Sequence, residues 1–372
     1  MVSPLPPSRR RALSLVALLP GAAIAGCAPG SEPATEAGDS GPTSPDGTGT
    51  SGAGTSGEEA TTIVSGLQAP WSIAFHAGSA LVSERDSARI LEVTEGGELR
   101  EVGIVDGVTP RGEGGLMGLA VHDAHLFAYF TAGDENRLAR FPLTGEPGAL
   151  ALGPAETLLD GIPAARVHHG GRLAIGPDEM LYVTVGDAGD AAQAQDPDTL
   201  LGTILRLTPD GGIPQDTPFP GSPVHSYGHR NPQGLAWDED GTLYASEFGQ
   251  DTWDELNVIE PGANHGWPEV EGRAEDPRFV DPVQQWTPEE ASPSGIALAH
   301  GSLWIANLRG RRLREVPLSD LSTSREHLVG THGRLRDVVV APDGALWVLT
   351  NTTDGRGDPH PDGDRILRLD RS

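Results

Sequence analysis

Three features are scarce in this sequence, and each scarcity argues against a class of protein. There is one cysteine and no HExxH pattern, so neither common signature of a zinc site is present. Basic residues number 26 against 53 acidic ones, and the formal net charge of −27 argues against nucleic-acid binding and suits an exported, soluble protein. Helix signals are also few. The 50 glycines and 32 prolines interrupt the chain every few residues and indicate an all-β fold.

The N-terminus has the pattern of a bacterial lipoprotein signal. Ser8–Arg11 is positively charged, and the apolar run Ala12–Ala25 is too short to span a bilayer comfortably. The run ends in Ile24–Cys27, which resembles a lipobox. We expect residues 1–26 to be a signal peptide and Cys27 to be lipidated, anchoring the exported protein to the outer face of the cell membrane. The alternative is a buried free thiol. The Ser-Arg-Arg start also resembles a twin-arginine signal, so Sec and twin-arginine export both stay open.

Residues 27–58 are mostly Gly, Ser, Thr, Pro and acidic residues, with almost nothing apolar. Such a segment buries too little surface to offset the entropy lost on ordering. The composition predicts a disordered tether between the lipid and one folded domain, residues 59–372. The lipid is then the only expected contact with a membrane.

One unit recurs from about Thr61 onward at unequal spacing. Each copy has a short apolar strand, a turn, a strand of the type LYVTVGD and a third strand of the type RILRL. The turns are rich in Asp and Gly, which supply the side-chain hydrogen bonds and positive φ of tight turns. The six copies predict a six-bladed β-propeller of antiparallel blades with three or four strands each. They lie at Trp71–Val93, Leu116–Leu143, Arg172–Leu207, Gln233–Ile259, Ser294–Val316 and Leu335–Leu369.

The strand Thr61–Val64 belongs to none of the six copies. We expect it to pair beside the C-terminal strand Ile366–Leu369 and to close the ring, because open sheet edges are usually covered. The alternative fold is an irregular β-sandwich.

Several polar residues precede the innermost strand of their copy. The loops at one mouth of a propeller channel converge, so these residues are expected to lie together. Arginine presents a planar fork that matches carboxylates. The cluster therefore predicts a seat for a polyanionic small molecule, although each arginine could instead pair with one of the many acidic side chains. The set comprises Glu113, His168, His169, Arg230, Asn231, Arg334 and Arg336, with Arg309 after the second strand of its copy.

Histidine is the natural general base near neutral pH. His168 and His169 precede Gly170 and Gly171, which allow a backbone to approach a ligand closely. They are candidate bases, although a lone histidine is more often structural.

The loop Gly249–Glu255 is rich in oxygen donors, including Asp251, Asp254 and Glu255. Calcium takes six to eight such ligands. The loop is a candidate calcium site, and a solvated acidic loop is the alternative.

Five motifs together resemble the glucose/sorbosone dehydrogenase family, the soluble aldose sugar dehydrogenases that use pyrroloquinoline quinone (PQQ). The resemblance covers about Leu67–Leu369. The motifs are His168–Asp178, Gly228–Trp237, Asp254–Pro268, Ser292–Leu298 and Gly333–Thr350.

The resemblance implies a six-bladed propeller that oxidises an aldose at the anomeric carbon to the lactone. His168 would take the anomeric proton while hydride passes to PQQ, and Ca²⁺ would polarise the quinone. It implies that PQQ is held at Glu113, Arg230, Asn231, Arg309, Arg334 and Arg336. Calcium would be bound by the carbonyls of Gly249 and Gln250, with Asp254, Glu255 and His265 as further metal candidates, and Trp286 lies in the region expected to face the sugar.

Four positions depart from the family pattern. Glu113 stands where glutamine is usual, and its charge would repel an anionic cofactor unless it is protonated or turned away. Arg309 replaces a lysine, and Gln250 replaces a proline. Val167 replaces the Asp or Asn that commonly precedes the base, so His168 is expected to lack that acidic neighbour.

Two other functions remain open from the sequence. One is a calcium-dependent lactonase or esterase propeller, which would leave the arginines without a partner. The other is a non-catalytic surface binding propeller. The motifs specify neither the sugar nor the electron acceptor, and we expect a monomer or homodimer.

Overall fold

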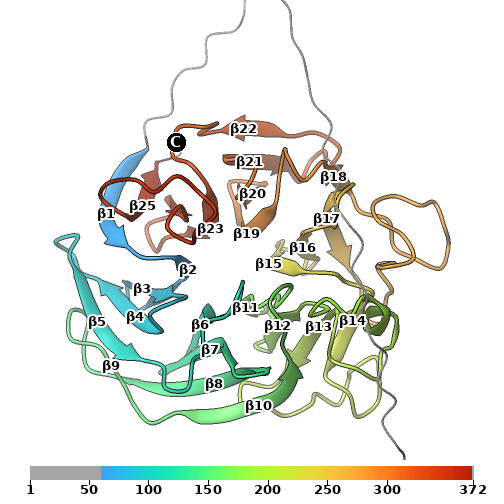
Figure 1. Ribbon diagram of the computed structural model, residues 1–372, viewed down its shortest axis with the longest axis horizontal. Helices are drawn as coiled ribbons and strands as arrows, with labels where there is room; N and C mark the ends of the chain where they lie inside the picture. The colour runs from blue at the N-terminus through green and yellow to red at the C-terminus, as the bar shows by residue number, and fades with distance from the viewer. Residues whose placement is uncertain (1–59, 371–372) are drawn as a thin grey trace, which may run out of the picture. The chain divides into compact units, whose positions relative to one another are not determined.

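The computed structural model describes residues 60–370, which form six antiparallel sheets arranged as blades around a central channel (Figure 1). The innermost strands of neighbouring blades contact one another around the channel. The all-β, six-bladed prediction is therefore confirmed. The predicted signal peptide, the tether and Cys27 lie outside the described residues. Within residues 60–370, no helix is long and apolar enough to cross a membrane.

Each blade runs from an inner strand beside the channel to an outer strand at the rim. Blade 1 consists of β2 (Pro70–His76), β3 (Ser79–Glu84), β4 (Arg89–Val93) and β5 (Leu99–Ile104). Blade 2 consists of β6 (Leu116–His122), β7 (His125–Ala132), β8 (Glu135–Thr144) and β10 (Glu156–Pro163). Blade 3 consists of β11 (Leu173–Ile175), β12 (Leu181–Val185), β13 (Thr203–Leu207) and β14 (Val224–Tyr227). Blade 4 consists of β15 (Pro232–Trp237), β16 (Leu243–Glu247), β17 (Asp254–Ile259) and β18 (Gln284–Trp286). Blade 5 consists of β19 (Pro293–Ala299), β20 (Ser302–Asn307), β21 (Arg312–Pro317) and β22 (Arg325–His327). Blade 6 consists of β23 (Leu335–Val340), β24 (Leu346–Thr350), β25 (Asp364–Leu369) and β1 (Thr61–Leu67).

Blade 6 joins the two ends of the described chain. β1 pairs antiparallel with β25, from Thr61 opposite Arg368 to Leu67 opposite Asp364. The predicted closure of the ring is therefore confirmed. The sequence did not show the short β9 (Ala151–Leu152), which adds a fifth strand to blade 2 beside β8. The only helical segment among the described residues is the 3-10 turn η1 (Ala191–Gln195).

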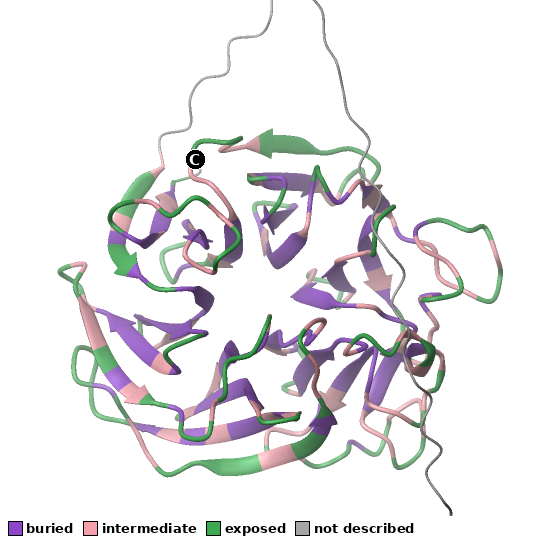
Figure 2. Ribbon diagram, in the orientation of Figure 1, coloured by how far each residue is buried: buried purple, intermediate pink, exposed green. Residues whose placement is uncertain are grey.

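The hydrophobic core is divided among the gaps between blades. Each of six apolar clusters is built mainly from two neighbouring blades, and Figure 2 shows the inner strands largely buried. Leu81 and Leu126, for example, belong to the cluster between blades 1 and 2. Because most of the apolar burial lies between blades, the stability of each blade depends on its neighbours. Polar groups can therefore occupy the channel-facing ends of the inner strands.

The predicted Asp-rich turns are built alike in blades 3 and 4. Asp238 accepts the N–H groups of Asp240 and Thr242 and the hydroxyl of Tyr244. Asp178 likewise accepts the hydroxyl of Tyr182, at 3.1 Å. These turns set the β15–β16 and β11–β12 connections at the face opposite the site described below.

His225 makes stability depend on pH. Its ring is buried in β14 against Tyr182, and burial, together with the Arg206 charge, lowers its pKa to about 4. Unfolding would return this pKa to about 6.5, so the unfolded chain takes up a proton first as pH falls. We therefore expect His225 to contribute a loss of about 2 kcal/mol of unfolding free energy between pH 7 and pH 5.

Denaturant titrations of wild type and His225→Gln at both pH values measure this contribution. The variant should lose less stability on acidification, while His169 and His229, whose pKa values are also lowered by burial, still contribute. Equal losses in the two proteins would contradict the assignment.

Candidate active site

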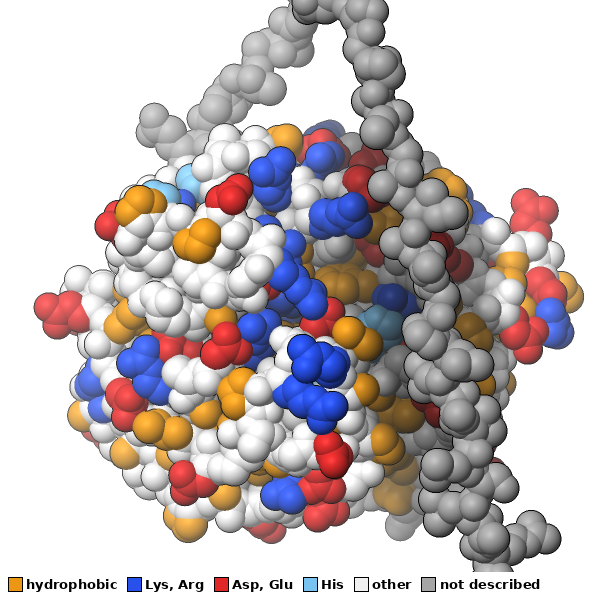
Figure 3. Space-filling model, in the orientation of Figure 1, with side chains coloured by type: hydrophobic (Ala, Val, Ile, Leu, Met, Phe, Trp, Pro, Cys, Tyr) orange, Lys and Arg blue, Asp and Glu red, His pale blue; other side chains and the backbone are white. Residues whose placement is uncertain are grey.

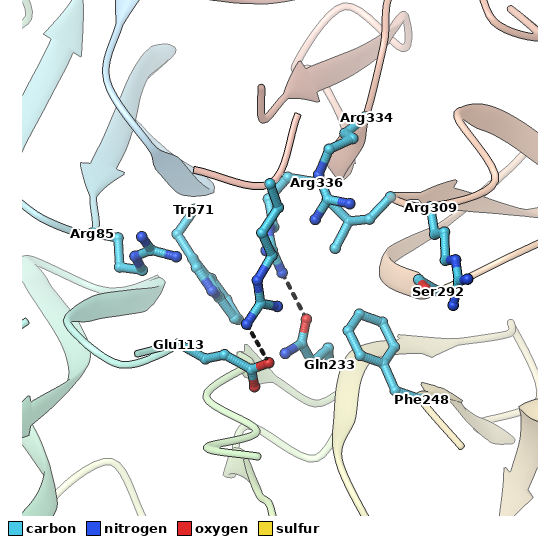
Figure 4. Close-up of a pocket in the computed structure, with 11 residues that line it drawn as sticks. Trp71, Arg85, Glu113, Gln233, Phe248, Ser292, Arg309, Arg334 and Arg336 are labelled. Atoms are coloured by element: carbon cyan, nitrogen blue, oxygen red, sulfur yellow. Dashed lines mark hydrogen bonds and ion pairs between the residues drawn. The ribbon is translucent and has the colours of Figure 1, made fainter. Parts of the chain in front are cut away.

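A cavity of about 210 Å³ lies at one mouth of the channel, where loops from different blades meet. In Figure 3 arginine side chains gather over the centre of this face, and Figure 4 shows Arg334, Arg336 and Glu113 around the cavity. Four of the residues predicted to hold the cofactor, Glu113, Arg309, Arg334 and Arg336, thus line one space although they come from three blades. The full lining is Trp71, Arg85, Glu113, Gln233, Phe248, Ser292, Leu308, Arg309, Arg334, Arg336 and Arg356.

Some of these arginines have acidic partners, as the alternative interpretation of the cluster expected. Arg309 pairs with Glu289 at 2.7 Å, with both side chains more than half exposed. Arg334 lies 3.4 Å from a carboxylate oxygen of the buried Asp354. The first pair is weak and easily exchanged because solvent screens it.

Arg336 has no such partner. Only 5% of the residue is exposed, and within residues 60–370 its Nη1 hydrogen bonds go to the neutral groups Gln233 Oε1 (2.7 Å) and Ser294 Oγ (3.2 Å). Burial lowers its guanidinium pKa to about 9. A buried cation with neutral partners is costly, so the site favours an anionic ligand.

Unused hydrogen-bond donors support the same conclusion. In the described part of the chain, the buried Nε atoms of Arg230, Arg334 and Arg336 have no hydrogen-bond partner. Buried donors are almost always satisfied, so each unpaired one calls for an explanation. Two of these arginines, Arg334 and Arg336, line the cavity, and their unpaired Nε donors favour a ligand with acceptor oxygens there.

His168 lies beside the cavity in a fixed orientation. Its backbone has φ +55°, which the following glycines and the close approach of Gly186 to the His168 carbonyl accommodate. Its N–H donates to Glu113 Oε2 at 3.0 Å, and its Nδ1 lies 2.6 Å from Asp187 Oδ1. The side chain is 17% exposed. The imidazole is therefore oriented by Nδ1 while its other nitrogen, Nε2, is left for a proton transfer.

Asp187 is a candidate functional residue that the sequence pattern did not indicate. It follows β12 in the motif LYVTVGD, and it also accepts Trp267 Nε1–H (2.8 Å) and the Gly189 N–H. Burial raises its pKa, but hydrogen bonds from His168 and the other donors outweigh burial and leave the pKa below its usual value. The expectation that His168 lacks an acidic neighbour because Val167 precedes it is therefore wrong, since Asp187 supplies the carboxylate from a different loop.

His169 points away from the cavity. Its Nδ1 lies 3.1 Å from Asn136 Oδ1 and 3.4 Å from Thr131 Oγ1 inside blade 2. Burial lowers its pKa to about 4, so it is neutral at physiological pH. Of the two adjacent histidines, only His168 has the position of a base.

Arg230 and Asn231 mainly tie loops together. Glu247 accepts the backbone N–H groups of both residues and lies 2.8 Å from His229 Nδ1. Asn231 Oδ1 accepts the Gly170 N–H at 2.9 Å, which fixes the loop that carries His168. Arg230 Nη1 donates to the Phe248 carbonyl and its guanidinium lies over Trp267.

The predicted calcium loop is wrapped around one carboxylate, that of Glu271. Its Oε1 accepts the backbone N–H groups of residues 250, 251, 252 and 253 at 2.5–3.2 Å. These bonds overcome the effect of burial and lower the pKa of Glu271. A Cβ at Gly249 would collide with the Trp253 carbonyl, so only glycine fits there. Within residues 60–370, no hydrogen bond uses the carbonyl oxygens of Gly249 and Gln250.

Asp254, Glu255 and His265 have other neighbours in the structure. Asp254 accepts the N–H groups of Gly249 (2.8 Å) and Ser292 (2.6 Å), and burial raises its pKa to about 6. Glu255 accepts from Gly272 and Asn257, and burial with nearby Glu247 raises its pKa. His265 is buried and stacked on His229. Among the described residues, no three His, Cys, Asp or Glu side chains are placed to share a metal ion.

Trp286 is not brought to the cavity. It belongs to β18, packs in the apolar cluster between blades 4 and 5 and lies under Arg314, 4.3 Å from the ring centroid. In this position the Trp286 side chain does not face the cavity, where a sugar was expected to bind.

Glu271 sets the shape of the 249–253 loop. We expect Glu271→Ala to speed hydrogen exchange at the amides of residues 250–253 by about tenfold or more, because four N–H groups lose one shared acceptor. Native-state exchange measured by mass spectrometry checks this. Glu269→Ala is the matched control, since Glu269 is an exposed carboxylate that pairs with Arg278. Equal exchange in both variants would contradict the role of Glu271.

Comparisons with known proteins agree with this geometry. The family model for glucose/sorbosone dehydrogenases matches residues 67–367. The structure is similar to the PQQ-bound aldose sugar dehydrogenase of Streptomyces coelicolor, with TM-score 0.80 and 50% identity over 83% of this chain and 96% of that one. Quinoprotein glucose dehydrogenase B of Acinetobacter calcoaceticus is 33% identical over 59% of this chain and 54% of its own length. Aldose sugar dehydrogenase YliI of Escherichia coli is 31% identical over 50% and 58%.

Proposed function

The chain belongs to the glucose/sorbosone dehydrogenase family, and from that premise we propose that it is a quinoprotein oxidoreductase acting on the CH–OH group of aldose sugars. PQQ binds in the arginine-lined cavity. The sugar is oxidised at its anomeric carbon to the lactone.

The observation that carries the cofactor proposal is the uncompensated charge of Arg336. PQQ is flat and carries three carboxylates, which suit guanidinium forks. The unpaired Nε atoms of Arg230, Arg334 and Arg336 are donors of the required kind. Arg336 also lies 5.6 Å from the centroid of the Trp71 ring. Because Trp71 lines the cavity as well, the proposed binding site contains a planar aromatic side chain beside the charged ones.

His168 is the proposed base. Because Asp187 accepts Nδ1–H, the lone pair of the neutral ring lies on Nε2, the atom that would take the anomeric hydroxyl proton. Glu113 holds the His168 backbone through its N–H, and Asn231 holds the next turn. When bound, PQQ supplies the oxidant, a quinone that accepts the two electrons removed from the sugar.

Calcium is proposed at the carbonyls of Gly249 and Gln250. Glu271 collects the N–H groups of this loop, and the two carbonyl oxygens make no hydrogen bond within residues 60–370. Carbonyl oxygens are donors that calcium accepts. The remaining ligands would come from PQQ and water.

Export and anchoring remain part of the proposal. Residues 1–26 would direct export, and Cys27 would carry the lipid that anchors the domain to the outer face of the cell membrane. Mass spectrometry of the mature N-terminus tests this. An unmodified Cys27 would overturn it.

The cofactor proposal is tested by adding PQQ and Ca²⁺ to the purified protein and measuring PQQ affinity by fluorescence quenching, then dye reduction across a panel of aldoses. Arg336→Gln should weaken PQQ binding by about 100-fold, since a buried charged hydrogen bond is lost. A chelator should weaken PQQ binding and lower the melting temperature of the loaded protein, because ligands that bind the folded state stabilise it. Absence of PQQ binding by wild type would refute the proposal.

A further inference from the structure

Among the described residues that line the cavity, Glu113 is the only carboxylate, and five arginines line the cavity with it. Its two oxygens have different partners. Oε2 accepts the His168 N–H at 3.0 Å, and Oε1 lies 2.9 Å from Nη2 of Arg356. In Figure 4 a dashed line ends on the carboxylate of the labelled Glu113.

Arg356 comes from a different part of the ring. It lies in the connection between β24 and β25 of blade 6, whereas Glu113 precedes β6 of blade 2. The two side chains therefore meet across the end of blade 1. Arg356 is 50% exposed and Glu113 is 21% exposed, so the acid is the more enclosed partner.

Arg356 also lines a second cavity of about 420 Å³ that adjoins the first. The two share Leu308, Arg309, Arg334 and Arg356, and the second cavity also includes the exposed Arg311. Removing Arg311 would therefore take one positive charge from the same mouth without touching Glu113. This makes Arg311 a matched control for Arg356.

We propose that Glu113 and Arg356 act as one electrically neutral unit in the cofactor-binding cavity. Glu113 is a positioning residue that holds the backbone of His168, and Arg356 cancels the carboxylate charge that would otherwise repel an anionic cofactor. The proposal rests on PQQ being the ligand of the cavity. Arg356 thus affects cofactor binding through its ion pair with Glu113 and makes no direct bond to the cofactor.

A double-mutant cycle on PQQ affinity tests the unit. The dissociation constant of PQQ is measured with Ca²⁺ for wild type, Arg356→Gln, Glu113→Gln, the double variant and Arg311→Gln. Arg356→Gln should weaken binding by about 10- to 30-fold, the effect of one uncompensated charge several ångströms away at an effective dielectric constant near 20. Glu113→Gln should tighten binding, because its amide oxygen still accepts the His168 N–H while Arg356 is freed.

The double variant decides between roles for Arg356. Restoration of PQQ affinity to within about threefold of wild type, with little effect of Arg311→Gln, supports the neutral unit. Equal weakening in the single Arg356 variant and the double variant would mean that Arg356 binds the cofactor itself and would overturn the unit. Unchanged affinity in every variant would also overturn it. Failure of wild type to bind PQQ would instead refute the proposed function, and the unit with it; melting curves confirm that each variant is folded.

Discussion

Replacing His168 with Gln is expected to slow the reduction of bound PQQ by an aldose about 10²- to 10⁴-fold, the usual range for a lost general base. PQQ affinity should stay close to that of wild type. This is because the arginines proposed to bind PQQ are not part of the His168–Asp187 pair. In addition, the variant keeps the backbone N–H that donates to Glu113, so the loop should stay in place.

Single-turnover bleaching of bound PQQ by sugar measures this rate apart from product release. His169→Gln is the matched control, because it removes an adjacent imidazole that faces Asn136 inside blade 2. Its rate should fall far less. If His169→Gln were the slower variant, the base assignment would be wrong by one residue, and normal rates in both would exclude a histidine base.

Asp187→Asn separates position from charge in the same assay. Asn has the size of Asp but no negative charge, so it neither stabilises a protonated His168 nor fixes its tautomer. We expect a loss in the same range as for His168→Gln, again with PQQ affinity kept. A wild-type rate would show that Asp187 only packs against the histidine.

The fold could be predicted because its signals are local and repeated. The turn around Asp238 and the apolar runs on either side of it are short-range patterns, and the copy predicted at Gln233–Ile259 coincides with β15, β16 and β17, which run from Pro232 to Ile259. The outer strands were not located individually. β18 and β22 are only three residues long, so their pairing depends on neighbouring strands rather than on a pattern of their own.

The candidate site was only partly predictable. Glu113, Arg309, Arg334 and Arg336 were grouped correctly because loops at one channel mouth must converge. Asp187 and Arg356 were missed, since their partners lie in other loops and no sequence spacing announces such a pairing. Glu271 escaped notice for the same reason.

A second large effect is expected below the cavity, where Arg172 joins four blades across the channel. Its Nη1 lies 2.9 Å from Asp337 Oδ2 on β23 and 3.3 Å from Ser72 Oγ on β2, and its Nε donates to the Gln233 carbonyl on β15. Its guanidinium also lies 4.5 Å from the Trp71 ring centroid. Both charged side chains are at least 93% buried.

Asp337→Ala should lower the free energy of unfolding by about 3–5 kcal/mol, because it leaves the Arg172 charge buried without its partner. Asp337 also accepts the Ile73 N–H, which loses its acceptor. Burial raises the pKa of Asp337 despite Arg172, so ionisation of this carboxyl is already costly. The melting temperature should fall by roughly 5–10 °C. PQQ affinity should fall too, since Gln233 connects this network to Arg336.

The double variant Arg172→Met/Asp337→Leu distinguishes an unpaired charge from lost packing. It removes both charges and keeps similar volume, so it should be more stable than Asp337→Ala alone. Arg278→Ala serves as the control, because Arg278 is 61% exposed and its ion pairs with Asp276 and Glu269 are solvated. Its melting temperature should match that of wild type. A double variant less stable than Asp337→Ala would show that the ion pair itself, and not merely the avoidance of a lone charge, holds the blades together across the channel.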